Sequence, residues 1–178
     1  MNVLVHVCCA PCFAYPHKRL EELGHKVTGY WYNPNIHPTL EYKARRNALD
    51  IYTELENVDV VCGEYDIVGY MTAAITAMEN NRRCESCYHM RLSTTARYAR
   101  EHNYDAFTTT MLVSHQQKHN KIRDIGEEVA NACKVPFYYE DFRTGWQQGR
   151  AIATQYGLYR QKYCGCLFSE WERYRDII

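Results

Sequence analysis

The chain begins with a short apolar run, Val3–Val7, that stops abruptly at the segment Cys8-Cys9-Ala10-Pro11-Cys12. The run is rich in β-branched residues and closed by a turn-like segment, which predicts a buried parallel strand. Three thiols directly after such a strand invite oxidation unless a metal or a redox reaction occupies them. Our working hypothesis is that this loop holds an iron–sulfur centre on which later cysteines converge.

Strand and helix patterns alternate along the rest of the chain. Strands are expected at residues 3–7, 26–32, 58–62, 106–113 and 135–139, and helices at 13–23, 40–55, 66–78, from about 84 to 101, and at 120–133, 147–156 and 169–178. This alternation predicts a doubly wound, mostly parallel, Rossmann-like sheet with a C-terminal helical extension. The length of 178 residues suits one domain spanning 1–178. Sites in such sheets lie at the carboxyl ends of the strands.

Charge is balanced, with 21 basic and 21 acidic residues, so no global basic field marks the chain as a nucleic-acid binder. Any RNA contact is therefore expected to be a local patch. No basic segment followed by an apolar stretch opens the chain, and no stretch approaches the length of a membrane span. We expect a cytoplasmic protein without membrane contact, in which nine cysteines favour metal or redox chemistry over a disulfide framework.

The cysteines form three clusters and two singletons: Cys8/Cys9/Cys12, Cys84/Cys87, Cys164/Cys166, and the single residues Cys62 and Cys133. The singletons end a predicted strand and a predicted helix, and we expect both to be small buried hydrophobes. The clusters carry the chemistry.

The spacing Cys84-x-x-Cys87 lets two thiolates reach one centre from a single turn. It fits zinc, an iron–sulfur cluster or a dithiol redox pair. Cys9 and Cys12 would complete a four-cysteine zinc site, but that site leaves Cys8 and the last cysteine pair unused. From the residues alone, zinc and iron–sulfur are equally supported.

The pair Cys164-Gly165-Cys166 is a less common pattern. A disulfide between residues this close departs from relaxed geometry and is easily reduced, which suits a working redox pair better than a structural brace. Both thiolates could instead bind a metal. Seven clustered thiols exceed the four that one cluster needs, so we expect a second metal or a dithiol beside the first centre.

Two common sites are disfavoured. The loop after the first strand has no glycine, and Pro11 lacks an N–H group, so phosphate or ATP binding at this loop is not expected. His115 and His119 are four residues apart but lie in a polar stretch, where a solvated loop is expected rather than a metal pair.

Taken together, these stretches resemble the QueH-type epoxyqueuosine reductases, a cobalamin-independent family that acts last in making queuosine in tRNA. The resemblance spans nearly the whole chain in order. It is carried by Cys8-Cys9-Ala10-Pro11-Cys12, Tyr32-Asn33-Pro34-Asn35-Ile36-His37-Pro38 with Glu41-Tyr42, Arg83-Cys84-x-x-Cys87-Tyr88 with Arg91-Leu92, Phe107-Thr108-Thr109-Thr110, Asp141-Phe142-Arg143 with Gly145-Trp146, and Tyr159-Arg160-Gln161-x-Tyr163-Cys164-Gly165-Cys166-x-Phe168-Ser169.

The resemblance implies a [4Fe–4S] cluster held by Cys8, Cys9, Cys84 and Cys87. It also implies a second centre at Cys164 and Cys166, as a redox disulfide or as ligands of a mononuclear iron, and Cys12 could serve either centre. The implied substrate is tRNA carrying epoxyqueuosine in the anticodon loop, and the electron donor is unidentified. The implied fold is related to the adenine nucleotide α-hydrolases, with cysteines in place of the phosphate loop.

Candidates for contact with substrate lie in or near the predicted loops. His37, Tyr42 and Asp141 could protonate the leaving oxygen. Arg45, Arg46, Arg83 and Arg160 could hold anticodon phosphates. Two other classes of function remain open: a zinc-stabilised RNA-binding module without catalysis, and a metal-free thiol–disulfide oxidoreductase that uses Cys164 and Cys166.

Overall fold

A computed structural model describes residues 1–177. Four parallel strands form one sheet in the order β3-β2-β1-β4. The strands are β1 (Asn2–His6), β2 (Lys26–Trp31), β3 (Val60–Cys62) and β4 (Ala106–Thr109). The α-helices are α1 (Ala10–Glu22), α2 (Thr39–Glu56), α3 (Ile67–Met78), α4 (Arg83–Glu101), α5 (His119–Cys133), α6 (Trp146–Gln155) and α7 (Leu167–Tyr174), and short 3₁₀ helices are η1 (Thr110–Val113), η2 (Phe142–Gly145) and η3 (Arg175–Ile177).

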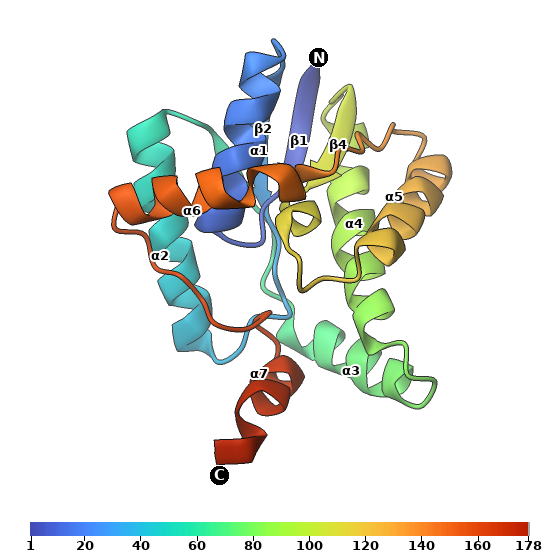
Figure 1. Ribbon diagram of the computed structural model, residues 1–178. Helices are drawn as coiled ribbons and strands as arrows, with labels where there is room; N and C mark the ends of the chain where they lie inside the picture. The colour runs from blue at the N-terminus through green and yellow to red at the C-terminus, as the bar shows by residue number, and fades with distance from the viewer. Residues whose placement is uncertain (178) are drawn as a thin grey trace.

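Helices cover both faces of the sheet, which confirms the doubly wound α/β architecture expected from the sequence (Figure 1). Val3, Val5 and Val7 pack in one apolar core with α1, α2 and α6, whereas Leu4 packs in the other with α4 and α5. This alternation follows from the two-residue period of a strand. Burying each such side chain contributes about 1.5–3 kcal/mol, so β1 is held from both sides.

The strand order places the topological switch point of the sheet between β1 and β4. Because these two strands are parallel, their carboxyl ends lie at the same edge of the sheet. Cys8 follows β1 at this edge, and α1 begins two residues later. Pro11 lies in the first turn of α1, where its missing N–H group costs no helical hydrogen bond. The cysteine segment is thus the turn between strand and helix.

Two expected strands are shorter than predicted. Residues 106–113 were expected to be one strand, but β4 ends at Thr109, whose hydroxyl accepts a hydrogen bond of 3.1 Å from the Met111 N–H group. This side-chain cap turns the chain into η1. The expected strand at 135–139 is a single bridge between Phe107 and Phe137. Pro136 has no N–H group to extend the ladder.

Other differences concern single residues. The prediction that Cys62 is buried is wrong, because β3 is a three-residue edge strand that leaves its side chain exposed, and Cys133 is only half-buried. His119 is also not in a solvated loop: it is buried as the first residue of α5, and its Nε2 lies 3.1 Å from the Tyr139 hydroxyl. The predicted last helix, 169–178, is α7 followed by η3, and residue 178 lies outside the described residues.

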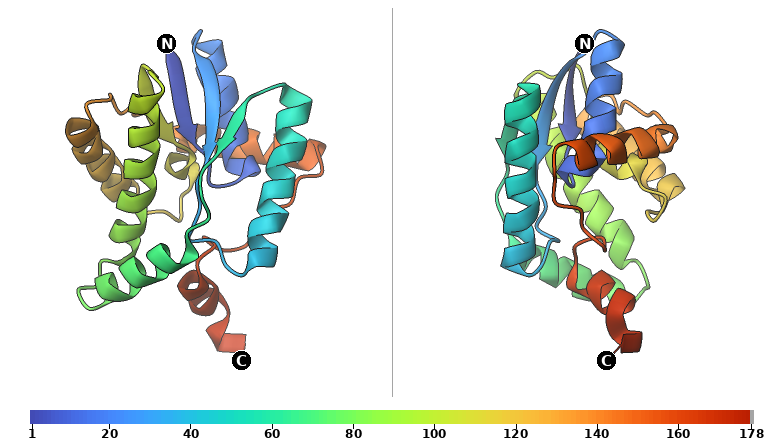
Figure 2. Two further views of the ribbon diagram at one scale, coloured as in Figure 1. Left: turned by 180° about the vertical axis from the view of Figure 1, so that it is seen from behind. Right: turned by 60° about the vertical axis from the view of Figure 1, so that its left-hand side comes forward.

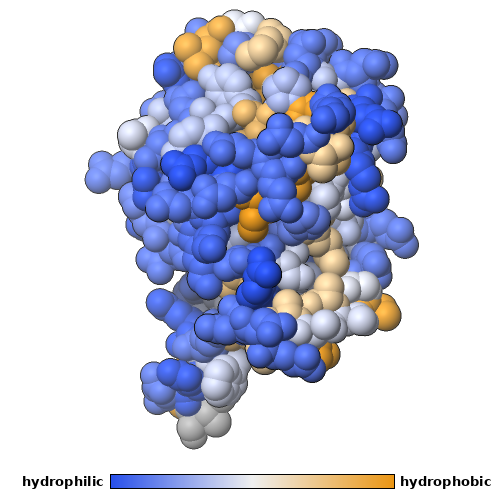
Figure 3. All heavy atoms as spheres, turned by 90° about the vertical axis from the view of Figure 1, so that its right-hand side faces the viewer, coloured by the Kyte–Doolittle hydropathy of each residue, from blue (hydrophilic) through white to orange (hydrophobic). Residues whose placement is uncertain are grey.

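The C-terminal part crosses back over the molecule. The segment after α6 runs past the open edge of the sheet, and α7 extends away from the body (Figures 1 and 2). Hydrophilic side chains cover most of the side shown in Figure 3, in keeping with the balanced charge. None of the helices in residues 1–177 is both long enough and apolar enough to cross a membrane.

Candidate metal and redox site

The cysteines of the first loop converge tightly. The sulfur atoms of Cys8, Cys9 and Cys12 all lie within 4.8 Å of one another, at the N-terminus of α1. Cys9 is the residue before the helix and Cys12 lies in its first turn, so one helical turn brings the three thiols together. The positive end of a helix favours thiolates. This arrangement can hold a metal.

Cys8 is also fixed from the neighbouring strand. Its N–H group donates a hydrogen bond of 2.9 Å to the Thr110 hydroxyl, which in turn lies 3.1 Å from the Cys8 sulfur. Hydrogen bonds from Cys12 and Cys9 hold the pKa of the Cys8 thiol well below its usual value. Hydrogen bonding to Cys8 raises the pKa of Cys12, and burial raises that of Cys9. Of the three thiols, Cys8 is therefore the one that loses its proton most readily.

The second cysteine cluster lies in the first turn of α4. Cys87 is buried and packs with Cys166 and Tyr70 in a small apolar cluster, and burial raises the pKa of its thiol to about 12. Cys84 is half-buried and lines a neighbouring hollow of 280 Å³. The structure thus places Cys87 of the second cluster next to Cys166 of the third cluster.

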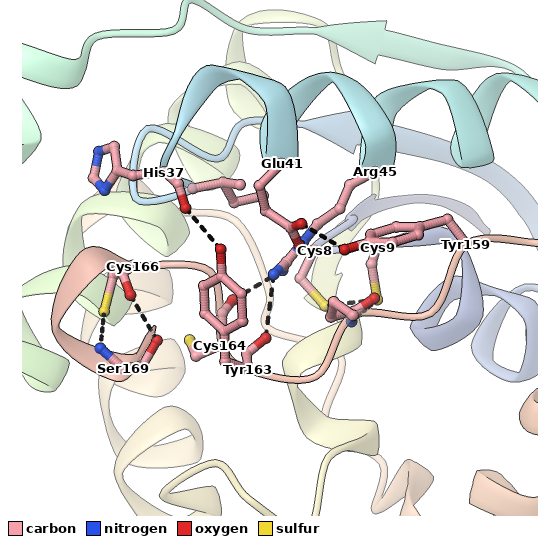
Figure 4. A network of polar contacts seen from close by, with 12 residues as sticks. Cys8, Cys9, His37, Glu41, Arg45, Tyr159, Tyr163, Cys164, Cys166 and Ser169 are labelled. Atoms are coloured by element: carbon pink, nitrogen blue, oxygen red, sulfur yellow. Dashed lines mark hydrogen bonds and ion pairs between the residues drawn. The ribbon is translucent and has the colours of Figure 1, made fainter. Parts of the chain in front are cut away.

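The third cluster is held in place by α2 (Figure 4). Arg45 is 2% exposed, pairs with Glu41 at 2.6 Å, and donates hydrogen bonds to the carbonyl oxygens of Cys164 (2.9 Å) and Tyr163 (3.2 Å). Gly165 has a φ of +121°, and a Cβ atom there would lie 3.0 Å from the Arg45 guanidinium. Only glycine suits this position.

The sulfur atoms of this cluster accept hydrogen bonds from other parts of the chain. The Ser169 N–H group donates to the Cys166 sulfur at 3.3 Å at the start of α7, and the Gln117 side-chain amide donates to the Cys164 sulfur at 3.4 Å. Burial raises the pKa of Cys164. No disulfide joins Cys164 and Cys166 in this structure.

Arg91 lies among the cysteine clusters with its guanidinium 2% exposed. It donates hydrogen bonds to Asn33 Oδ1 at 2.8 Å and to His6 Nε2 at 3.2 Å, and one of its nitrogens lies 3.9 Å from the Cys87 sulfur. No ion pair joins it to a carboxylate within residues 1–177. A buried cation requires a counter-charge.

The available counter-charge is sulfur. Burial disfavours the charged form of Arg91, but the negative charge that Cys87, Cys8 and Cys164 carry when they are deprotonated raises the pKa of its guanidinium. His6 adds no second positive charge, because burial and the Arg91 charge lower its pKa to about 3 and keep the imidazole neutral. The electrostatics of this buried region therefore suit an anionic group bound to sulfur.

A cavity of about 410 Å³ opens directly on these groups. Cys8, Cys12, Cys164 and Arg91 line it, and its other lining residues are mainly polar or cationic: Arg45, Ser114, Gln116, Gln117, Gln161, Lys162, Arg173, with Met111, Trp146, Tyr163, Ser169 and Glu172. The volume is in the range of cavities that take a small organic ligand. A nucleoside-sized group could thus reach the cysteines.

Of the residues predicted to contact substrate, Arg45 alone lines this cavity. His37 is buried, its ring lies 5.4 Å from that of Tyr70, and burial lowers its pKa. Tyr42 packs in the core, where its hydroxyl accepts a hydrogen bond of 2.7 Å from the Trp31 indole. Arg46 pairs with Asp50 on the surface of α2.

The remaining candidates lie elsewhere. Arg83 lines the hollow beside Cys84 and pairs with Glu172 at 2.8 Å. Arg160 is exposed on the segment after α6. Asp141 caps η2 and is paired with Arg143 at 2.6 Å, which holds the pKa of its carboxyl at about 2. A carboxylate with so low a pKa has no proton to donate near neutral pH.

Several residues of the site were given no role from the sequence. Arg91, Thr110, Gln161 and Trp146 lie in the stretches that carry the resemblance, and Gln117 lies outside them. One signal was available for Arg91, because it follows Cys87 by four residues and so lies on the same face of α4. The Gln161 amide lies 2.8 Å from the Cys9 sulfur, a contact across 152 residues that no local pattern indicates.

Comparisons with known proteins find one family that matches this chain over nearly its whole length. The family model described as epoxyqueuosine reductase QueH matches residues 3–172. An epoxyqueuosine reductase QueH from Dehalococcoides mccartyi is 38% identical over 174 residues, covering 97% of this chain and 94% of the relative. The protein of the same name from Thermotoga maritima is 37% identical over 182 residues, covering 97% and 92%.

Among solved structures, the chain resembles a crystal structure described as a predicted subunit of a tRNA methyltransferase from Methanocaldococcus jannaschii, with a TM-score of 0.54. The two share 14% sequence identity, over 85% of this chain and 76% of the other. At this identity the likeness concerns the fold alone, and it agrees with the α/β architecture with a parallel sheet expected from the sequence.

Proposed function

The chain belongs to the epoxyqueuosine reductase QueH family, and on this premise we propose that it deoxygenates epoxyqueuosine in the anticodon loop of tRNA. The reaction takes two electrons and two protons, converts the epoxide to an alkene and releases the oxygen as water. The electrons come from an external donor that the sequence leaves unidentified. Because the proposed substrate is a tRNA, we also propose that the protein acts in the cytoplasm, in agreement with the expectation from the sequence.

The observation that carries the cofactor proposal is the buried, carboxylate-free guanidinium of Arg91 among cysteine sulfurs. The donor set is sulfur, which suits iron–sulfur clusters and zinc. We assign a [4Fe–4S] cluster to Cys8, Cys9, Cys84 and Cys87, and a second iron or a redox dithiol to Cys164 and Cys166. When bound, such a cluster supplies electrons singly, and a second centre completes the two-electron reduction.

Cys12 fits the first centre better than the second. Its sulfur lies within 4.8 Å of those of Cys8 and Cys9, and it lines the same cavity as Cys8. The proximity to Cys8 and Cys9 supports Cys12 as a ligand, or a proton-carrying neighbour, of the centre at the first loop. Cys87, in contrast, packs with Cys166 and so lies where the two centres would meet.

The protein's own side chains orient the substrate and the sulfur atoms. Gln117 and Gln161 donate hydrogen bonds to sulfur and line the cavity, so either amide can turn toward a hydroxyl of the substrate. Arg45 fixes the loop that carries Cys164. Lys162 and Arg173 line the cavity without an ion-pair partner among residues 1–177 and can attract the phosphates of the RNA.

Anaerobic purification with counts of iron, sulfide and zinc per chain tests the cofactor assignment. We expect brown protein with four or more irons, and conversion of epoxyqueuosine to queuosine in tRNA when a chemical reductant is supplied. Cys84→Ala should lose the cluster. Cys62→Ser is the matched control, because its thiol is exposed on the edge strand. Colourless protein with one zinc and no iron would favour the zinc-stabilised RNA-binding module instead.

The second centre is tested separately. Cys164→Ser should keep the sulfide content of the cluster and lose turnover, because its sulfur lines the cavity. A fully active Cys164→Ser variant would exclude Cys164 and Cys166 as the second centre. A metal-free protein that still cycles a Cys164–Cys166 disulfide would support the thiol–disulfide oxidoreductase.

A further inference from the structure

The indole of Trp146 lines the cysteine cavity together with Cys8 and Cys12, and it also packs against the edge of the core that contains Leu4; the cysteine chemistry gives it no role. Trp146 is half-buried, so part of its ring remains accessible from the cavity. We propose that Trp146 is a stacking platform for the nucleobase next to the modified nucleoside in the anticodon loop. This inference rests on the proposed function and identifies how the RNA is held at that site.

The helix that begins at Trp146 packs close to the cysteine loop. It is the first residue of α6, which packs along α1. A Cβ atom at Gly145 would lie 2.1 Å from the Tyr15 ring, and one at Gly149 would lie 3.1 Å from the Pro11 carbonyl oxygen. Two glycines thus let the start of α6 approach the segment between Cys8 and Cys12, and they fix the indole relative to the sulfur atoms.

The surroundings of the indole suit a nucleobase. The His115 ring meets it edge-on, with centroids 5.9 Å apart and planes at 88°, and the Arg150 guanidinium lies 6.0 Å from its centroid. An aromatic face beside an arginine is the usual platform for unpaired bases of RNA loops. Lys162 and Arg173 line the same cavity and supply charges for the adjoining phosphates.

The position of Trp146 also decides which base it meets. Cys8, Cys12 and Cys164 line the cavity together with Trp146. The epoxide must lie against the sulfur atoms to be reduced, so the modified nucleoside takes the part of the cavity next to the cysteines and the indole meets the neighbouring nucleotide. Stacking tolerates any base, and the platform therefore positions the RNA without reading its sequence.

The test compares Trp146→Leu and Trp146→Phe, because leucine keeps apolar bulk without a stacking face and phenylalanine keeps the face. Trp171→Leu is the matched control: Trp171 is 56% exposed and has an arginine over its ring at 5.2 Å, but it does not line the cavity. The readouts are affinity for an unmodified anticodon stem-loop RNA, by fluorescence anisotropy, and KM and kcat for a stem-loop carrying epoxyqueuosine.

We expect Trp146→Leu to weaken stem-loop binding about tenfold to a hundredfold, from the usual stacking contribution of one base. KM should rise in parallel while kcat changes less, Trp146→Phe should stay within a few-fold of wild type, and Trp171→Leu should match wild type. Binding and KM unchanged in Trp146→Leu, or kcat alone reduced, would overturn the proposal. A wild-type protein that binds the stem-loop but never reduces epoxyqueuosine would instead overturn the proposed function.

Should Trp146→Leu fail to fold, the pair Trp146→Phe and Trp146→His decides the matter in the same two assays. Both variants keep an aromatic face, and binding should follow the size of that face, with phenylalanine tighter than histidine at pH 8. Equal losses in these two variants, with native thermal melting, would show that the indole acts only as a packing residue.

Discussion

The Arg45 guanidinium donates a hydrogen bond of 2.9 Å to the carbonyl oxygen of Cys164, a residue 119 positions further along the chain. The same guanidinium pairs with Glu41, and both side chains are nearly inaccessible. A buried charge that holds a loop by its backbone fixes the position of the loop without using its side chains. The loop therefore keeps its thiols free for chemistry.

Replacing Arg45 should cost both stability and activity. Arg45→Met leaves Glu41 buried without its partner, which lowers the free energy of unfolding by about 3 kcal/mol. The loop that carries Cys164 loses two hydrogen bonds, so turnover should fall by an order of magnitude or more. Urea unfolding and the reductase assay check these outcomes. Arg46→Met is the control, because that exposed pair should change stability by less than about 1 kcal/mol.

Gly165 and Gly157 offer a matched pair of substitutions. Both have positive φ, but a Cβ atom at Gly157 meets nothing within 4 Å, whereas one at Gly165 meets Arg45 and Ile36 at 3.0 Å. Gly157→Ala should cost about 1 kcal/mol of backbone strain and leave activity unchanged. Gly165→Ala should cost more and reduce turnover. Equal turnover in the two variants would contradict the role given to the loop.

Arg91→Met separates folding from cofactor binding. Removing a buried charge that has no carboxylate partner should leave the free energy of unfolding of the metal-free protein within about 2 kcal/mol of wild type. Iron retention should fall sharply, because the counter-charge of the sulfur-bound group is lost. Iron counts and melting temperatures, with and without chelator, measure both effects. Full iron content in Arg91→Met would show that Arg91 does not balance the charge of the site.

Stability should also fall in mildly acidic solution. His17 is buried between α1 and α2, its Nδ1 lies 2.8 Å from the Tyr52 hydroxyl, and burial lowers its pKa below 6.5. The unfolded chain binds a proton below pH 6.5 that folded His17 rejects, so this stability is complete above pH 6.5 and is lost as the pH falls.

The pH dependence can be assigned by mutation. The free energy of unfolding of the metal-free wild type, measured with urea between pH 7 and 5, should fall with pH more steeply than that of His17→Gln. The two slopes should differ by at most about 1.4 kcal/mol per pH unit. Other buried histidines, such as His6, keep part of the slope in the variant. Identical slopes would mean that His17 is protonated in the folded protein.

The sequence predicted the layers of the fold better than their ends. The Val-rich run before Cys8 is hydrophobic on both faces, a pattern that belongs to a central parallel strand, and β1 is indeed central. The predicted strand ends were wrong at positions where a single hydrogen-bonding group determines the end of the strand. The Thr109 hydroxyl ends β4, and Pro136 withholds the N–H group that would have lengthened the last strand.

From the sequence, the cysteines of the candidate site could be proposed, but the roles of most side chains around them could not. Spacing alone paired Cys84 with Cys87 because one helical turn joins them. No spacing joins Arg91 to Asn33, or Gln161 to Cys9, since those contacts exist only after β1, β2 and α4 have packed. Long-range burial, and with it the electrostatic character of the site, is a property of the folded sheet.

The distribution of the cysteines also bears on the order in which the protein matures. The first thiols leave the ribosome with residue 8 and the last with residue 166, and the segment that carries the last pair lies against α2 through Arg45. At roughly 5–20 residues per second, the early thiols wait for many seconds before their partners are synthesised. The nascent chain therefore passes through a stage in which its first three thiols are exposed before the cysteines of α4 and of the last pair have been synthesised.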